Sequence, residues 1–114
     1  MKVYLCDGIK YRPILDDELT LYIVSVPHLD SEWRSSSPMY IPEGKGYQAK
    51  KDIVNGLIDA GECICPPEVD IVREGLMVVD GRHRLSIIRD KGKKEMIVSS
   101  KGELPYKWAK KIAP

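Results

Sequence analysis

The feature that most constrains the fold is a continuous apolar run, Leu76–Val79, which leads directly into Asp80, Gly81 and a segment with helical spacing. An apolar run without alternating polar residues is typical of a strand buried on both faces, so we expect it at the centre of a sheet. Gly81 permits a tight turn, and Leu85 and Ile88 then lie on one face of a helix. The sequence thus predicts a strand, a glycine turn and a helix in direct succession.

Local patterns place the other elements along the chain. An Asp-Gly pair between alternating residues predicts a hairpin, and β-branched runs predict strands. The expected elements are a hairpin over 1–15, a strand over Leu19–Val26 that Pro27 ends, a loop over His28–Gly46, a helix over 47–60 with Gly61 as its cap, strands over Val69–Val72 and Met96–Val98, a turn at Arg73-Glu74-Gly75, a helix that Gly92 ends, and a tail over 101–114 with a short amphipathic helix that packs Trp108 on the body. This order predicts a single α+β domain over residues 1–114.

The charge distribution is more informative than the net charge of +1. Residues 1–81 carry 8 basic and 14 acidic side chains, a net of −6, whereas residues 82–114 carry 10 basic and 3 acidic ones, a net of +7. The sign changes between Gly81 and Arg82, inside the predicted turn. A local field of this kind attracts a single anion, whereas broad electrostatic coating of DNA is not expected.

The N-terminus and the cysteines indicate a cytoplasmic protein without a membrane partner. Charged residues interrupt the first dozen positions, so neither a signal peptide nor a membrane span is expected. Three Cys residues form no even disulfide framework, which suits a reducing compartment. Cys63 and Cys65 are too few for a typical zinc site, so we predict no metal bound through them and interpret them as small apolar side chains.

The turn at Asp80–Arg84 carries the side chains that an anion site needs. Free N–H groups at a helix N-terminus point to one spot, and the helix dipole favours negative charge there. Gly81 has no Cβ to block an approaching ligand, while Arg82 and Arg84 supply guanidinium groups that suit phosphate. His83 can transfer a proton near neutral pH, and Asp80 can accept one or hold a cation. The alternative is structural: Asp80 caps the helix, the arginines are solvated and His83 bonds to backbone.

Two adjoining segments resemble the ParB/sulfiredoxin-like superfamily. Residues 66–72, Pro-Pro-Glu-Val-Asp-Ile-Val, and 77–85, Met-Val-Val-Asp-Gly-Arg-His-Arg-Leu, are similar to its strand pair and its Asp-Gly-x-His-Arg turn at a helix N-terminus. The resemblance is clear over 62–98 and looser over 19–61, so the hairpin over 1–15 and the tail over 101–114 are additions. It implies a small mixed β-sheet with helices packed on it. Members include the ParB N-terminal domain, sulfiredoxin, free-serine kinases, and phage or plasmid nucleases and nucleotide hydrolases.

The resemblance also assigns roles to particular residues. It implies phosphate binding by Gly81, Arg82, His83 and Arg84. The chemistry of their side chains makes His83 the expected general acid or base and Asp80 the expected group that activates water or holds Mg²⁺. Arg82 stands where sulfiredoxin has its Cys, so thiol chemistry is not expected. The Gly-Glu-Arg-Arg pattern of ParB is absent, so chromosome segregation by this chain alone is not expected. The remaining assignments are Asp30 or Glu32 as a carboxylate that follows the first core strand, and Arg34 and Lys91 as supporting contacts to nucleic acid.

Three functions remain open at this stage. The first is hydrolysis of a nucleotide such as ATP or CTP, or cleavage of nucleic acid, with Mg²⁺ or Mn²⁺ as an expected cofactor. The second is a non-catalytic effector of phage or plasmid type that binds a nucleotide or a protein partner. The third is DNA binding through the basic tail over 101–114. The oligomeric state stays open.

Side chains outside the turn allow two interpretations. Trp33, Tyr40 and Tyr47 are interleaved with basic residues (Arg34, Lys45, Lys50 and Lys51), a pattern that fits base stacking with phosphate contacts. The same aromatic residues can equally fill a core that contains no Phe. His28, next to Pro27 at the expected strand end, fits either a catalytic side chain or, preferably, an ordinary turn residue.

Overall fold

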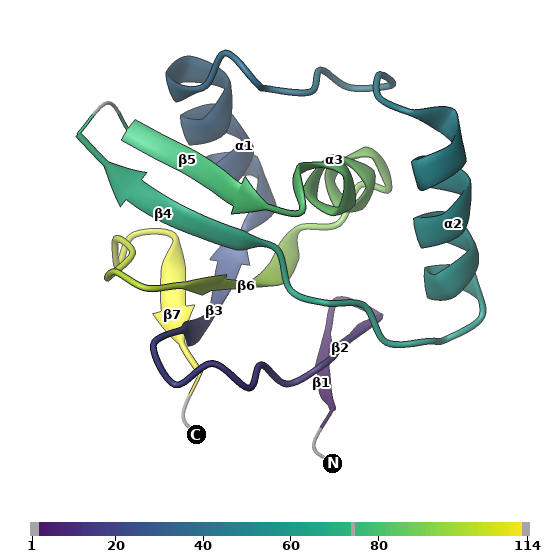
Figure 1. Cartoon of the computed structure of the whole chain (residues 1–114), viewed down its shortest axis with the longest axis horizontal. Coiled ribbons are helices and arrows are strands. Elements are labelled where there is room, and N and C mark those ends of the chain that lie inside the picture. The colour runs from purple at the N-terminus through teal and green to yellow at the C-terminus, as the bar shows by residue number, and fades with distance from the viewer. Residues whose placement is uncertain (1–2, 74, 113–114) are drawn as a thin grey trace.

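The computed structural model describes residues 3–73 and 75–112 and confirms the mixed α+β class. Five strands form one sheet in the order β5-β4-β6-β3-β7, and β1 and β2 form a separate hairpin (Figure 1). In chain order the elements are β1 (Tyr4–Cys6), β2 (Ile9–Tyr11), β3 (Thr20–Ser25), α1 (Val26–Ser36), α2 (Gln48–Asp59), β4 (Glu68–Val72), β5 (Gly75–Asp80), α3 (Arg82–Asp90), β6 (Glu95–Ser100) and β7 (Ala109–Lys111).

The predicted hairpin is present, and its turn is attached to the main sheet. Asp7 and Gly8 both have positive φ, 47° and 79°, as a two-residue hairpin turn requires. The Asp7 carboxylate accepts a hydrogen bond from the backbone N–H of Lys94 at 2.7 Å and a longer one from that of Glu95 at 3.4 Å. One side chain thereby joins the β1–β2 turn to the start of β6.

The segment predicted as a loop over His28–Gly46 begins as a helix, so that prediction is wrong over its first part. Pro27 does not end the secondary structure; it occupies the first turn of α1, where a missing backbone N–H removes no hydrogen bond. Val26, Leu29 and Trp33 are buried on one face of this helix. Irregular backbone remains only over residues 37–47, between α1 and α2.

β5 does not lie at the centre of the sheet, as its apolar sequence led us to expect. It is an edge strand that pairs with β4 alone, and the central position belongs to β6, whose Met96, Ile97 and Val98 are buried. Burial along β5 alternates: Leu76 is buried, whereas Met77 is 43% and Val79 47% exposed. The turn before β5 was predicted at Arg73-Glu74-Gly75, and Glu74 lies outside the described residues.

The amphipathic helix predicted in the tail is also wrong within the described residues. The tail forms β7, which pairs antiparallel with β3 and leaves Leu104 and Ala109 buried. Trp108 packs against the core as expected, but its carbonyl accepts the N–H of Ser25 in an interstrand bond. Pairing with β3 therefore overrides the four-residue spacing. Residues 113–114 of this prediction lie outside the described residues.

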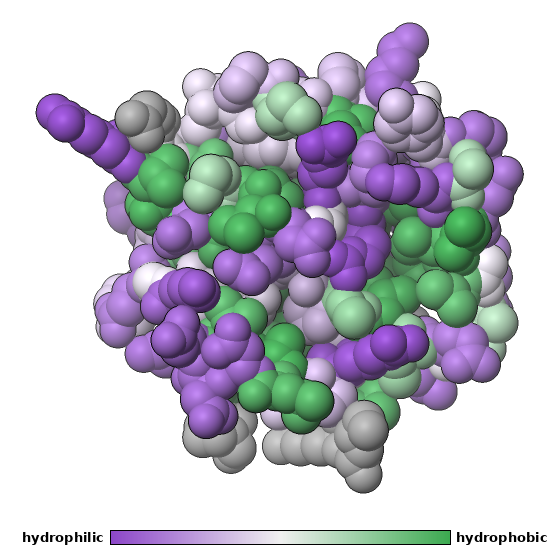
Figure 2. All heavy atoms as spheres, in the orientation of Figure 1, coloured by the Kyte–Doolittle hydropathy of each residue, from purple (hydrophilic) through white to green (hydrophobic). Residues whose placement is uncertain are grey.

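The helices differ in how firmly the core holds them. α3 buries Leu85 and Ile88 completely, and Trp33 of α1 is buried beside them in one cluster. α2 has no buried residue, packs mainly on α3 and stands at the side of the molecule in Figure 1. Figure 2 shows apolar side chains over this helix, where Ile53 is 65% exposed. No helix in the part of the chain described is long and apolar enough to span a bilayer.

Candidate phosphate-binding site

The site begins at the turn from β5 into α3, where Gly81 adopts a left-handed conformation with φ 88°. Gly81 is the residue at the N-terminal cap of α3, and no side chain caps the helix. Its carbonyl accepts the N–H of Leu85, so the N–H groups of the three preceding residues have no acceptor within the helix. The structural alternative, in which Asp80 caps α3, is therefore wrong, and the helix N-terminus is open to a ligand.

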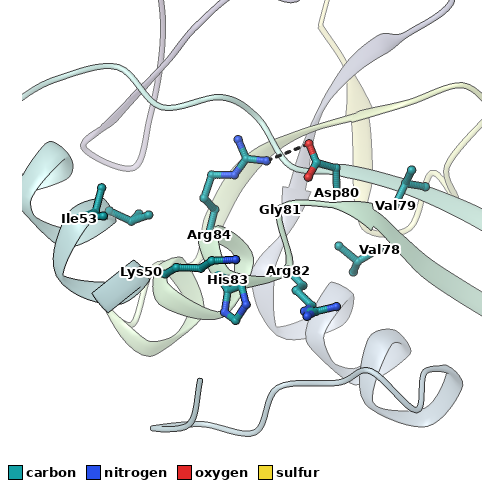
Figure 3. Close-up of a pocket in the computed structure, with 10 residues that line it drawn as sticks. Lys50, Ile53, Val78, Val79, Asp80, Gly81, Arg82, His83 and Arg84 are labelled. Carbon is teal, nitrogen blue, oxygen red and sulfur yellow. Dashed lines mark hydrogen bonds and ion pairs between the residues drawn. The ribbon is translucent and has the colours of Figure 1, made fainter. Parts of the chain in front are cut away.

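Arg84 folds back over Gly81 toward the end of β5 (Figure 3). Its guanidinium donates to the carbonyl of Cys65 at 3.2 Å and to the carboxylate of Asp80 at 3.4 Å. A Cβ on Gly81 would lie 2.5 Å from Nη2 of Arg84. We expected the missing Cβ to admit a ligand; the structure shows that it makes room for the chain's own arginine.

The turn forms the floor of a pocket of about 350 Å³ between α2, the end of β5 and the start of α3. It is lined by Lys50, Ile53 and Val54 of α2, by Val78, Val79 and Asp80 of β5, and by Gly81, Arg82, His83 and Arg84. Figure 3 shows the ammonium of Lys50 reaching toward the turn, while Arg82 and His83 point to the side opposite Asp80. We name this the turn pocket. The lining holds three permanent cations, Lys50, Arg82 and Arg84, and one carboxylate, Asp80, so the pocket attracts an anion.

His83 lies among these cations without a hydrogen-bond partner. Both of its ring nitrogens are shielded from solvent and unpaired in the described part of the chain. Burial of the ring, and then the positive charges of Lys50, Arg82 and Lys51, hold the pKa of His83 below its usual 6.5. The imidazole is therefore neutral at pH 7, and both ring nitrogens keep their hydrogen-bonding capacity unused in the described residues.

The other residues predicted for the site lie elsewhere. None of Asp30, Glu32, Arg34 and Lys91 lines the turn pocket. The carboxylate of Asp30 receives hydrogen bonds from Arg89 at 3.1 Å and from the Tyr40 hydroxyl at 2.9 Å, and Glu32 is exposed on α1.

Two basic residues from this prediction have acidic neighbours. Arg34 approaches Asp30 at 3.7 Å, and Lys91 pairs with Asp59 at 3.3 Å. The structure thus brings Asp80 to Arg84 together and leaves the upstream carboxylates apart from them. Catalytic roles for Asp30 and Glu32 stay predictions.

Lys50 is the pocket residue that sequence reasoning did not assign to the turn. It belongs to the first part of α2, and only the packing of α2 on α3 brings its ammonium beside His83. The sequence signal was its place among the interleaved aromatic and basic residues, but nothing in that pattern connects residue 50 with residue 83.

A divalent cation is not held by the pocket's own side chains. Among residues 3–73 and 75–112, no three His, Cys, Asp or Glu side chains gather closely enough to bind a metal ion. Mg²⁺ and Mn²⁺ prefer carboxylate oxygens, and the pocket's Asp80 is paired with Arg84 and faces Lys50 and Arg82. These residues do not fit a protein-held cation site, and the chemistry proposed for the pocket uses none.

Comparison with known proteins gives no relative for this chain: no protein-family model, no curated protein and no solved structure matches it. The turn pocket is therefore interpreted from its own residues and geometry.

Proposed function

We propose that this chain is a phosphate-binding domain of the ParB/sulfiredoxin-like type, and that the turn pocket takes the phosphate of a nucleotide or of nucleic acid. The observation that carries the proposal is that Lys50, Arg82 and His83 line one pocket at the uncapped N-terminus of α3. The Asp-Gly-Arg-His-Arg sequence that suggested the resemblance forms the floor of this pocket.

The charge of the turn pocket matches a phosphate better than a carboxylate. Lys50, Arg82 and Arg84 carry three positive charges, and Asp80 carries one negative charge. The difference of two equals the charge of a phosphate monoester dianion. Backbone N–H groups and guanidinium N–H groups can each bond a separate phosphate oxygen, because the tetrahedral group presents oxygens in several directions.

Hydrolysis of a bound ester would use the neutral imidazole of His83 as a general base. As a neutral imidazole it would take a proton from water as the water oxygen bonds to phosphorus. The phosphorus–ester oxygen bond breaks, and the leaving oxygen would take the proton that the His83 imidazole removed from water, which returns the imidazole to its neutral form. Arg82 and the α3 amides would stabilise the charge that develops on the phosphate oxygens. This chemistry makes the chain a nucleotide hydrolase or a nuclease.

A specific observation also favours a second candidate, a non-catalytic effector that binds a nucleotide. Catalytic histidines are commonly held in one tautomer by a carboxylate. Neither ring nitrogen of His83 has a partner in the described residues, and Asp80 is paired with Arg84. A binding module needs only the cations and amides, which are all in place.

Titration calorimetry with ATP, CTP and inorganic phosphate tests the binding site. Arg82→Ala and Lys50→Ala each remove a charge-assisted contact, so we expect each to weaken binding by roughly 10- to 100-fold. The matched controls are Arg73→Ala and Lys10→Ala, which remove exposed basic side chains outside the turn pocket. Unchanged affinity in both pocket variants would overturn the assignment.

A turnover assay separates the two candidate functions. Purified protein is incubated with ATP, CTP, single-stranded DNA or plasmid DNA, with and without Mg²⁺ or Mn²⁺. Product that is lost in His83→Ala and retained in His28→Ala identifies a hydrolase or nuclease. Tight binding without product identifies the effector.

A further inference from the structure

A second hollow adjoins the turn pocket and shares two of its residues. It has a volume of about 470 Å³ and is lined by Pro38, Met39, Tyr40, Ile41, Pro42, Lys45, Gly46, Tyr47, Arg82 and His83. Most of this lining comes from residues 37–47, the segment that connects α1 to α2 across the top of Figure 1. We name it the loop hollow. Arg82 and His83 line both spaces, so the two spaces adjoin at these two side chains.

The two spaces differ in chemistry. The floor of the turn pocket is cationic, whereas the loop hollow is lined mainly by aromatic, aliphatic and proline side chains, with Lys45 as the charge that the loop itself contributes. Binding sites for small organic ligands have this character, with apolar walls and a few polar groups that fix orientation. A ligand that is anionic at one end and flat and apolar at the other fits the pair.

The wall of the loop hollow is fixed in place by α3. Arg89 donates to the Tyr40 hydroxyl at 3.2 Å and to the carbonyl of Ile41 at 2.5 Å, and the N–H of Gly44 donates to Asp90 at 3.2 Å. Ile41 is itself buried. These bonds hold the loop before any ligand arrives, which lowers the conformational cost of binding.

Tyr47 lines the loop hollow and contacts two residues of the turn pocket, His83 and Lys50. Its ring packs edge-on against that of His83 with 5.8 Å between centroids, and the ammonium of Lys50 lies 5.9 Å from its centroid. The side chain is nevertheless 68% exposed, so much of the ring remains available for contact. Gly46, just before Tyr47, has φ 114°, a backbone conformation that favours glycine.

We infer that the loop hollow is the subsite for the base of a nucleoside 5′-phosphate whose phosphate occupies the turn pocket, and that Tyr47 is the stacking surface for this base. The inference rests on the proposed function, because it takes the phosphate position from it. Stacking of a base on an aromatic side chain contributes about 1–3 kcal/mol, and every base has a face that can stack. Tyr47 therefore sets the preference for nucleotides over other phosphate esters.

Two ligands that share a phosphate test the inference: ribose 5-phosphate, which lacks a base, and AMP. We expect the wild-type chain to bind AMP more tightly than ribose 5-phosphate. Tyr47→Ala should weaken AMP binding by about 5- to 150-fold and leave the affinity for ribose 5-phosphate unchanged. Tyr47→Phe should retain AMP affinity. Tyr106→Ala is the matched control, because Tyr106 is 90% exposed and lines neither space.

The outcomes separate the two proposals. If wild-type protein binds neither ligand, the phosphate site and the base subsite are both overturned. If it binds both equally and Tyr47→Ala changes neither affinity, the base subsite alone is overturned. Equal weakening of both ligands in Tyr47→Ala would also overturn the base subsite, because the variant would then act through His83 and Lys50.

Discussion

Arg89 of α3 and Asp30 of α1 form an ion pair of 3.1 Å in which the side chains are only 9% and 15% exposed. Asp90, the Tyr40 hydroxyl and the carbonyl of Ile41 are further partners of this guanidinium. A buried charge that keeps all its partners is tolerated, but one that loses a partner is strongly destabilising. The pair therefore fastens α1 and the segment over residues 37–47 to α3.

Arg89→Met should lower the free energy of unfolding by about 3–5 kcal/mol, because it leaves the largely buried Asp30 with only the exposed Arg34, at 3.7 Å, as a cation. Asp30→Asn should cost less, about 1–3 kcal/mol, because Arg89 keeps its bonds to Asp90 and Ile41. Urea denaturation measures both. Phosphate affinity should persist in Asp30→Asn at temperatures where it is folded. Loss of turnover without loss of stability would instead support the catalytic role predicted for Asp30.

Gly81→Ala should destabilise the fold and disturb the turn pocket. A side chain at φ 88° costs about 1–2 kcal/mol, and the added Cβ would displace the guanidinium of Arg84 from Asp80. Gly56→Ala is the control, because Gly56 lies inside α2 with open space at its Cβ position. That variant should stabilise the protein by about 0.5–1 kcal/mol. Thermal denaturation measures the stability of both variants. A Gly81→Ala variant as stable as the wild type would contradict the role given to this turn.

The His83 imidazole should couple phosphate binding to pH. Burial and nearby cations hold the pKa of His83 in the folded chain below 6.5, its usual value in an unfolded chain. As the pH falls from 6.5 to this lower pKa, the unfolded chain takes up more protons than the folded one, so the folded chain loses stability. A bound phosphate adds negative charge and should raise the pKa of His83. An NMR titration with and without phosphate measures this shift, and His28, which is hydrogen-bonded to Ser25 and does not line the turn pocket, is the reference signal. If the pKa of His83 is the same with and without phosphate, the anion does not bind beside His83.

Local signals in the sequence were sufficient for the β4–β5–α3 succession and the Asp7-Gly8 hairpin. Each is encoded within a few residues by apolar runs, a glycine with positive φ and helical spacing. The wrong predictions for β5 and for the tail concern contacts between segments far apart in the sequence. The edge position of β5 depends on which strands pair with β4, and the extended tail depends on β3; neither partner is visible in the local pattern. Pro27 was misjudged because proline is equally suited to end a strand and to begin a helix.

The site was predictable to the same degree. The residues of the Asp80–Arg84 turn could be singled out because an apolar strand ends there, a helix begins, and charged side chains follow one another over the same five positions. Lys50 was not assigned to it because only the packing of α2 on α3 brings this residue to the turn. The hydrogen bonds of Arg84 to Asp80 and to the carbonyl of Cys65 depend on the folded backbone, which the sequence pattern does not specify. Asp30 was proposed as a catalyst because the family resemblance implies a catalytic carboxylate after the first core strand. In the folded chain it has an arginine partner, Arg89, which no local pattern links to it.

The Asp7 carboxylate should make the hairpin's attachment to β6 dependent on pH. Its hydrogen bond from the Lys94 amide lowers its pKa below the usual 3.8, so the stabilisation is complete above that pH and is lost as pH falls through the lower folded-state pKa. Asp7→Ala should lower stability by roughly 1–2 kcal/mol at pH 7, because the backbone N–H groups of Lys94 and Glu95 lose their acceptor. The φ of 47° at residue 7 is also unfavourable for alanine. Asp7→Asn keeps an acceptor and tolerates this φ, so it should cost less. The stability difference between wild type and Asp7→Asn should shrink as pH is lowered toward 3; a difference that stays constant with pH would show that the charge on Asp7 contributes nothing to the attachment.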